Sequence, residues 1–149
     1  MNPLLIAAGE GKSVNILGGA VLIRLHGRDT AGVVSVLETD DQPGEGPPPH
    51  VHHREDETFQ VLEGEYEFTC AGRTFTAHPG ATVFAPRDVP HSYRCVSGTP
   101  GRLMFTLTPA GFEGFFEEVG VLTPEEQEIP RVIEIGLRYG LEFLPPPSA

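Results

Sequence analysis

Short runs in which apolar and polar residues alternate fill the first two-thirds of the chain. A period of two predicts β-strands with one buried face, and turns containing glycine or proline separate the runs. The predicted strands cover residues 20–26, 33–39, 58–62, 65–70, 73–77, 81–85, 91–96 and 103–108. Many short strands at this spacing predict an antiparallel barrel or sandwich, which is a mainly all-β fold.

Two turn sequences indicate how some of these strands connect. Ala71-Gly72 joins two runs as a hairpin and sets Phe68 opposite Phe75 on one face. His78-Pro79-Gly80 has the signature of a type II turn, because proline presets one central dihedral angle and glycine accepts a positive φ at the next. Both sequences favour short connections between strands.

The apolar period changes from two to 3.6 in the last third of the chain. The positions of one apolar helix face are Phe112, Phe115, Phe116 and Val119. Thr108-Pro109 is expected to begin this helix as its N-cap and first residue, and Gly120 is expected to end it. We expect the stripe to pack on the outer face of the barrel or, alternatively, to form a dimer contact.

Further helix signals follow this stripe. Thr123-Pro124-Glu125-Glu126 matches a capping box and predicts another helix start. Pro130 is expected to interrupt that helix, and residues 131–139 are expected to form a short one that ends at Gly140. Residues 145–149 are expected to form a frayed tail.

Composition and charge exclude several classes of protein. The 149 residues, 39% of them hydrophobic, suit one domain over residues 1–149, with the barrel at about 14–108 and a helical tail at about 109–144. The formal net charge of −11 disfavours nucleic acid and anionic membranes as partners, because both repel an acidic chain. Cys70 and Cys95 are too few for a disulfide framework, and no secretory signal opens the chain. We therefore expect a cytoplasmic protein without a membrane or nucleic-acid partner.

Three of the six histidines crowd into one short segment, His50, His52 and His53. On a strand, His50 and His52 point to the same face and His53 to the other, so the segment can deliver two imidazoles to one metal ion. Glu57, at the start of the next apolar run, can add an oxygen ligand. His91, which opens a predicted strand, is the best remaining candidate for a fourth ligand.

The spacing of these residues resembles the two sequence motifs of the cupin family. The first motif, G(X)5HXH(X)3,4E(X)6G, is matched by Gly44, His50, His52, Glu57 and Gly64. The second, G(X)5PXG(X)2H(X)3N, is matched by Gly80, Pro86 and His91 but departs at Asp88 and Cys95, where glycine and asparagine are usual. Two separated motifs in the right order make this a specific resemblance.

The resemblance implies a small antiparallel jelly-roll β-barrel with a metal ion in its mouth. The implied metal ligands are His50, His52, Glu57 and His91, and Glu57 is also the candidate catalytic residue. The implied cofactor is one divalent transition-metal ion, with iron, manganese, nickel, copper and zinc all left open. The run at residues 47–64 and the helical tail are similar to single-domain cupins that resemble quercetin dioxygenases.

Strand alternation also predicts the walls of a substrate pocket. Tyr93 and Cys95 share the face of His91, and Phe59 and Val61 are expected to point inward from the strand of Glu57. Such an apolar wall suits a small substrate with a flat or aromatic body. Cys95 has two interpretations, a small buried apolar side chain or a pocket thiol that contacts the metal site.

Three functions fit this combination of motif and pocket. The first is a metal-dependent dioxygenase that acts on a small organic substrate, with aromatic and flavonol-like molecules as the candidates. The second is an isomerase or lyase that uses the metal only as a Lewis acid, and the third is a non-catalytic small-molecule-binding protein. A homodimer is expected in each case, because pairing with a second copy covers exposed sheet edges.

Overall fold

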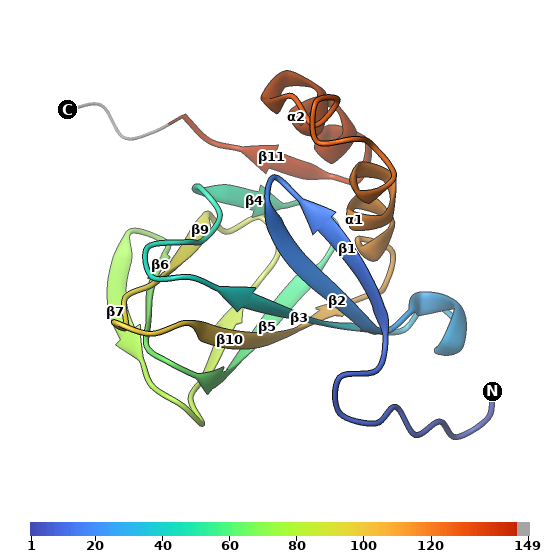
Figure 1. Ribbon diagram of the computed structural model, residues 1–149, viewed down its shortest axis with the longest axis horizontal. Coiled ribbons are helices and arrows are strands. Elements are labelled where there is room, and N and C mark those ends of the chain that lie inside the picture. Colours follow the sequence, from blue (N-terminus) through green and yellow to red (C-terminus); the bar gives the residue numbers. More distant parts are fainter. Residues whose placement is uncertain (146–149) are drawn as a thin grey trace.

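The computed structural model describes residues 1–145, and most of them lie in two antiparallel sheets that face each other (Figure 1). The six-stranded sheet has the order β1 (Lys12–Ile16), β2 (Gly19–Leu25), β3 (Ser35–Asp41), β10 (Gly101–Thr108), β5 (Asp56–Glu63) and β8 (Thr82–Ala85). The five-stranded sheet has the order β11 (Leu141–Phe143), β4 (His50–His52), β9 (His91–Cys95), β6 (Tyr66–Cys70) and β7 (Arg73–Ala77). The predicted jelly-roll fold with short C-terminal helices is confirmed.

The hairpin predicted around Ala71-Gly72 is present as β6 and β7. Phe68 lies directly opposite Phe75, and their rings stack with centroids 6.0 Å apart. At the predicted type II turn, Gly80 has a φ of +91°, and the N–H of Ala81 donates to the carbonyl oxygen of His78. Local turn chemistry was therefore sufficient to predict these connections.

The apolar core fills the space between the two sheets, as alternation along each strand requires. Every second residue of β3, β5 and β10 is buried, while the residues between them are more exposed. The largest fully buried apolar side chains are Tyr66, Phe59, Phe68, Leu37, Leu103 and Leu107. This core supports the inward-facing positions at which the site is built.

Three strands, β1, β4 and β11, were absent from the predicted strand ranges, although His50 and His52 were expected to share a strand face. Val14 is the one buried residue of β1, so its alternation is too weak to stand out. β11 has three residues and lies in the region predicted to be helical, but it pairs with β4, Leu141 opposite His52 and Phe143 opposite His50. Gly140, with a φ of +76°, turns the chain from the preceding helix into this strand.

The first long helix, α1 (Glu113–Gly120), begins later than Thr108-Pro109 suggested. The buried Glu113 carboxylate accepts the N–H groups of Gly111 and Gly27, each at 2.7 Å. These bonds tie the helix start to the short 3₁₀ helix at Gly27–Asp29, so a tertiary contact sets the boundary.

The second helix, α2 (Ile129–Arg138), also differs from the prediction. Thr123–Glu126 forms a turn, in which the Glu126 carboxylate accepts the Thr123 N–H at 2.9 Å. Pro130 lies in the first turn of α2 instead of interrupting a helix, because the first turn does not need the N–H that proline lacks. Residues 146–149 of the predicted frayed tail lie outside the described residues. None of the helices within residues 1–145 is long and apolar enough to cross a membrane.

The apolar stripe of α1 faces the interior of its own chain. Phe112, Phe115 and Val119 are buried, and α1 and α2 lie together beside β1 and β11 (Figure 1). The Phe116 ring packs on Phe105, with centroids 6.1 Å apart. The predictions that this stripe covers the outer face of the barrel or forms a dimer contact are therefore wrong, because its own chain already buries it.

Candidate metal centre

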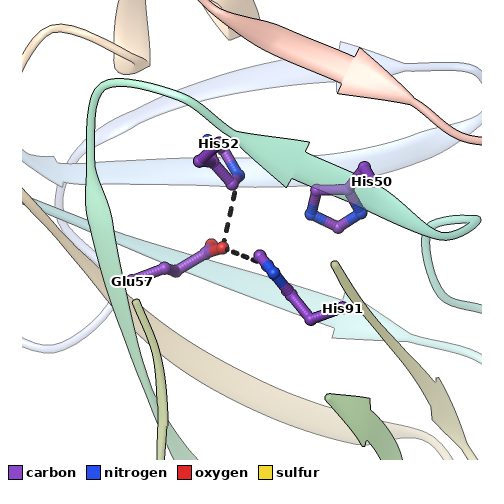
Figure 2. Close-up of side chains that lie close together, drawn as sticks. All are labelled: His50, His52, Glu57 and His91. Carbon is purple, nitrogen blue, oxygen red and sulfur yellow. Dashed lines mark hydrogen bonds and ion pairs between the residues drawn. The ribbon is translucent and has the colours of Figure 1, made fainter. Parts of the chain in front are cut away.

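Both sheets contribute to a cluster of polar side chains between them. His50 and His52 come from β4 and His91 from β9, while Glu57 comes from β5 of the opposite sheet. All four side chains are buried, with no more than 5% of any residue exposed. Figure 2 shows the four side chains pointing toward a common centre.

The loop before β4 holds the two histidines in place. Gly44 donates its N–H to the carbonyl oxygen of Cys95, and the Cys95 N–H donates to the carbonyl oxygen of Glu45, both at 2.8 Å. Gly46 lies so close to β9 that an added Cβ would sit 1.9 Å from the Tyr93 carbonyl oxygen. Three prolines then lead into β4 along an extended path, since their φ angles are fixed. The loop therefore docks against the strand that carries His91.

The four side chains lie at distances that suit one metal ion. One potential ligand atom from each residue lies within 4.8 Å of all the others. Glu57 Oε2 is 3.0 Å from His91 Nε2 and 3.3 Å from His52 Nε2. His50 and His91 are directly opposite each other on β4 and β9, with ring centroids 4.4 Å apart. Residues far apart in sequence thus meet at one point.

Hydrogen bonds through Nδ1 orient Nε2 of two of the histidines toward the centre of the cluster. His50 Nδ1 donates to the carbonyl oxygen of Pro48 at 2.8 Å, and His91 Nδ1 donates to that of Val89 at 3.0 Å. A ring that donates through Nδ1 carries its lone pair on Nε2. His50 and His91 are therefore held in the tautomer that a metal ligand requires.

His52 differs from the other two histidines because its Nδ1 faces a carboxylate. Glu55 Oε2 lies 3.5 Å from His52 Nδ1, and neither atom has a hydrogen-bond partner among the described residues. Glu55 is only 3% exposed, although sequence analysis identified no role for it. The acidic run around it resembles an ordinary solvated turn, so only burial distinguishes Glu55. A slight closure of this gap would form the carboxylate–histidine pair that is common at metal sites.

The buried charges shift the pKa values of these groups in opposite directions. Burial, together with neighbouring His91, lowers the pKa of His50 to about 4. Burial also disfavours protonated His52, but the carboxylates of Glu57 and Glu55 outweigh that effect and raise the pKa of His52 to about 9. Burial alone would raise the pKa of Glu57, yet His52 and His91 hold it far below its usual range. Glu57 therefore stays ionised, and a metal ion would replace the proton on His52.

The donor set fits a divalent transition-metal ion. Three imidazole nitrogens and one carboxylate oxygen suit iron, manganese, nickel, copper or zinc, whereas calcium and magnesium prefer sites made of oxygen alone. The Nδ1 bonds of His50 and His91 and the ionised Glu57 present three of the donors in the form that metal binding needs, and His52 would give up its proton when the metal binds. These observations support a metal site without identifying the ion.

The cluster opens into a cavity of about 340 Å³. His50, His52 and Glu57 line one part of it, together with residues of the β1–β2 hairpin, the loop before β4, and both helices. The aromatic residues of its wall are Tyr93, Phe105, Phe112, Phe115, Phe116 and Phe143. Phe112 packs edge-on against His52, with centroids 4.4 Å apart. The cavity wall is thus largely apolar, with several aromatic side chains, and His50, His52 and Glu57 of the cluster form part of it.

The predicted pocket residues fall into two groups. Tyr93 lines the cavity, and burial raises its pKa well above the usual value, so it stays a neutral phenol. Phe59, Val61 and Cys95 do not line the cavity, because they belong to the core below it. The Cys95 thiol contacts the Ser97 hydroxyl at 3.3 Å, which is the environment of a small buried side chain. Alternation correctly predicted that these residues face inward but could not distinguish cavity wall from core.

The helix aromatics are the lining residues that sequence analysis missed. The spacing of Phe112, Phe115 and Phe116 predicted one apolar face, and all three instead line the cavity. Phe143 comes from β11, which the sequence analysis did not predict. No local signal in the sequence indicates that these side chains lie near the histidines.

The two departures from the second motif leave the site intact. Asp88 has a φ of +64°, the left-handed region that favours glycine, and aspartate tolerates it better than most residues. Its N–H donates to the carbonyl oxygen of His52 at 2.8 Å. Its carboxylate lies 2.7 Å from Nδ1 of His53, which points away from the cluster and is exposed, as alternation predicted. Asp88 therefore fixes β4 from outside.

Comparisons with known proteins agree with this description. The cupin domain family matches residues 37–107. Quercetin 2,3-dioxygenase from Bacillus subtilis (strain 168) is 30% identical over 120 residues, which are 79% of this chain and 35% of that enzyme. Polyketide synthase CurC from Streptomyces cyaneus is 32% identical over 68 residues, which are 46% of this chain and 44% of that protein. The chain thus spans less than half the length of either relative.

Solved structures show the same fold at lower sequence identity. KdgF from Halomonas sp. superimposes with a TM-score of 0.67 at 18% identity, covering 76% of this chain and 99% of that one. A predicted oxalate decarboxylase from Thermotoga maritima gives a TM-score of 0.64, also at 18% identity, covering 71% of this chain and 99% of that one. These likenesses concern the fold alone.

Proposed function

Because this chain is a member of the cupin family, with its cupin domain at residues 37–107, we propose that it is a metal-dependent dioxygenase acting on a small aromatic molecule. The observation that carries the proposal is the buried cluster of His50, His52, Glu57 and His91 at the wall of an aromatic cavity. The 30% identity to quercetin 2,3-dioxygenase supports the reaction class. The substrate is specified only as an aromatic compound.

The metal ion would be held by the three Nε2 atoms and the Glu57 carboxylate. A redox-active ion with this ligand set supplies dioxygen chemistry and open positions for oxygen donors of a substrate, whereas zinc supplies Lewis-acid chemistry. Pro48 and Val89 keep the protons of His50 and His91 on Nδ1. Glu55 would hold the corresponding proton of His52, so each ligand ring has an acceptor behind it.

Glu57 has a second role in this proposal, as the catalytic residue. It is the only carboxylate of the four ligands, and it lines the cavity where a substrate hydroxyl would lie. Its low pKa keeps the carboxylate ionised, so it can accept a hydrogen bond from a substrate hydroxyl. Glu57 is only 4% exposed, so its carboxylate is largely shielded from bulk water.

Oxygen uptake with defined metals tests the proposal. Metal-free protein is loaded separately with iron, manganese, nickel, copper and zinc and then given flavonols, catechols and diketones under air. We expect substrate-dependent oxygen uptake with at least one redox-active ion and none with zinc. His91→Ala should abolish uptake, and the matched control His78→Ala, which alters an exposed histidine outside the cluster, should retain it.

Two other results would replace the proposal with an alternative. Turnover by the zinc-loaded protein without oxygen consumption would identify a Lewis-acid isomerase or lyase. Tight binding of a ligand with no turnover under any metal would indicate a non-catalytic binding protein. Both outcomes use the same site, so the metal ligands would stay as assigned.

We also propose that the protein forms a homodimer in the cytoplasm. Cys70 and Cys95 are both free thiols, which suits a reducing compartment. β8 is an edge strand of the six-stranded sheet, and its Phe84 is 59% exposed, so a second copy has an apolar edge to cover. Light scattering after size-exclusion chromatography should give about twice the chain mass of 16.1 kDa. A monomer at micromolar concentration would contradict this proposal.

A further inference from the structure

The cavity has two polar ends with different chemistry. One end carries His50, His52 and Glu57, and the other carries Asp40 and Asp41 at the end of β3 with Glu45 in the following loop. Strand β10 lies between β5 and β3 and shows that the two ends are apart. Glu57 of β5 lies opposite Leu107 near one end of β10, whereas Asp41 of β3 lies opposite Gly101 at the other end. Aromatic side chains lie between these ends, so an elongated ligand would meet both.

Asp41 is a fixed part of this wall and not a mobile surface acid. The residue is only 8% exposed, and its Oδ2 accepts hydrogen bonds from the Tyr66 hydroxyl at 2.8 Å and the Thr39 hydroxyl at 2.9 Å. Tyr66 is itself fully buried. Burial raises the pKa of Asp41, but both hydroxyl groups oppose that rise by donating to its charged form. Since both donors reach Oδ2, Oδ1 is left to accept from another group.

The acidic end contains no group that would neutralise an anion. None of the cavity-lining residues within the described chain, 1–145, is lysine or arginine. Asp40 and Glu45 add negative charge beside Asp41, and the whole chain has a net charge of −11. A ligand carboxylate or phosphate at this end would meet like charge from the buried Asp41 and from the exposed Asp40 and Glu45, which weakens its binding.

We propose that Asp41 determines specificity, selecting ligands that carry an uncharged or cationic hydrogen-bond donor at the end remote from the metal and rejecting ligands that carry an anion there. The inference rests on the proposed function, because the metal fixes the other end of the ligand. It adds to that function a selectivity for the charge of the ligand group that lies at the acidic end of the cavity. The ligand hydroxyl or ammonium group donates to the Asp41 carboxylate, while Tyr66 and Thr39 hold that carboxylate in position.

Three catechols that differ only at the distal end of the molecule test this rule. The probes are 3-(3,4-dihydroxyphenyl)propan-1-ol, 3-(3,4-dihydroxyphenyl)propylamine and 3-(3,4-dihydroxyphenyl)propanoate, which are neutral, cationic and anionic at pH 7.5. Each is titrated calorimetrically, without oxygen, into zinc-loaded full-length protein, because zinc has no redox chemistry. Zinc binding is measured first, with the metal alone.

We expect the alcohol and the amine to bind about tenfold more tightly than the propanoate, which is the size that one like-charge contact at about 4 Å gives when the local dielectric is close to that of water. Asp41→Asn should remove most of that difference and keep the zinc stoichiometry. Glu125→Gln, an equal change of charge at an exposed residue outside the cavity, should leave the difference unchanged.

The possible failures are distinguishable. If zinc binds, three results would overturn the role of Asp41: equal affinity for the three catechols, tightest binding of the propanoate, or no binding of any catechol. Each of these results leaves the metal site standing. Absence of zinc binding overturns the proposed function, and the inference fails with it. If Asp41→Asn does not fold, the order of the three affinities in the unaltered protein still decides.

Discussion

Strands β5 and β9 carry different chemistry at their two ends, although each is regular and uninterrupted. At one end Glu57 and His91 face each other with their polar atoms 3.0 Å apart. Two residues further along each strand, the inward positions are Phe59 and Tyr93, whose rings pack with centroids 5.5 Å apart. The strand geometry is the same for both pairs, so position within the sandwich decides that one pair forms a polar cluster and the other packs as aromatic rings, with Phe59 in the core and Tyr93 between the core and the cavity.

The difference shows how this fold separates stability from chemistry. The aromatic end removes apolar surface from water and stabilises the fold without help. The polar end buries three imidazoles and a carboxylate, which costs free energy unless they are paired or bind a metal. We therefore expect substitutions at the aromatic end to lower the free energy of unfolding and substitutions at the polar end to lower the affinity for metal.

Phe68→Ala should give the largest loss of stability. Phe68 is fully buried and packs on Phe59, Tyr66 and Tyr93, so its truncation leaves a cavity in the core. We expect the free energy of unfolding to fall by about 3–5 kcal/mol in urea denaturation of the metal-free protein. One bound metal ion per chain should remain under native conditions. Loss of the bound metal with an unchanged free energy of unfolding would contradict this separation of stability from metal binding.

His91→Ala should have the opposite profile. Removal of one of four ligands should weaken metal affinity about a hundredfold to a thousandfold, as judged from the binding energies of four-ligand sites. The stabilisation that metal gives to thermal unfolding should disappear with it, because a bound ion stabilises only the folded state. Competition with a chelator measures the affinity, and His78→Ala is the control. Unchanged affinity would remove His91 from the site.

Glu55→Gln tests a smaller effect behind the ligands. Glutamine keeps the shape of the side chain but removes the charge that faces His52 Nδ1. We expect metal affinity to fall about tenfold to a hundredfold, the range for partners of ligating histidines. A copper- or cobalt-loaded sample should also show a shifted ligand-field spectrum. Glu125→Gln should change neither property, and equal behaviour of both variants would show that Glu55 only fills space.

Proton release on metal binding should give the smallest signal. Because the pKa of His52 is raised to about 9 and that of His50 is lowered to about 4, His52 carries a proton at pH 7.5 and His50 does not. Zinc binding should thus expel about one proton from His52, and this release should fade as the pH rises through 9. Calorimetry in buffers of different ionisation enthalpy measures the number. Equal release at pH 7.5 and pH 10 would contradict the pairing of His52 with Glu57.

The raised pKa of His52 also predicts how the stability of the metal-free protein changes as the pH rises. A histidine whose pKa is higher in the folded state stabilises the fold fully below its unfolded pKa of about 6.5. That contribution is lost as the pH rises through about 9. The thermal midpoint of metal-free protein should therefore fall over this range, and saturating zinc should suppress the fall, since His52 is then deprotonated throughout.

Much of the site could be predicted from sequence because its residues lie in regular strands. Alternation placed His50 and His52 on one face and His53 on the other, and the motif spacing added Glu57 and His91. Glu55 could not be predicted, because its acidic neighbours resemble those of a solvated turn and only burial distinguishes it. Helix boundaries failed for a related reason, since Glu113 begins α1 through a bond to distant Gly27.

The sequence by itself determined most of the strands, the hairpin turns, and which of their side chains face inward, because dihedral preferences and periodicity act over a few residues. Tertiary structure alone decided that Phe112 and Phe143 close the cavity beside the histidines and that Phe59 lies below it. It also decided that Asp41 is a buried acceptor at the far end, held by Tyr66 from the opposite sheet. These arrangements depend on contacts between segments far apart in the chain, and local pattern carries no information about such contacts.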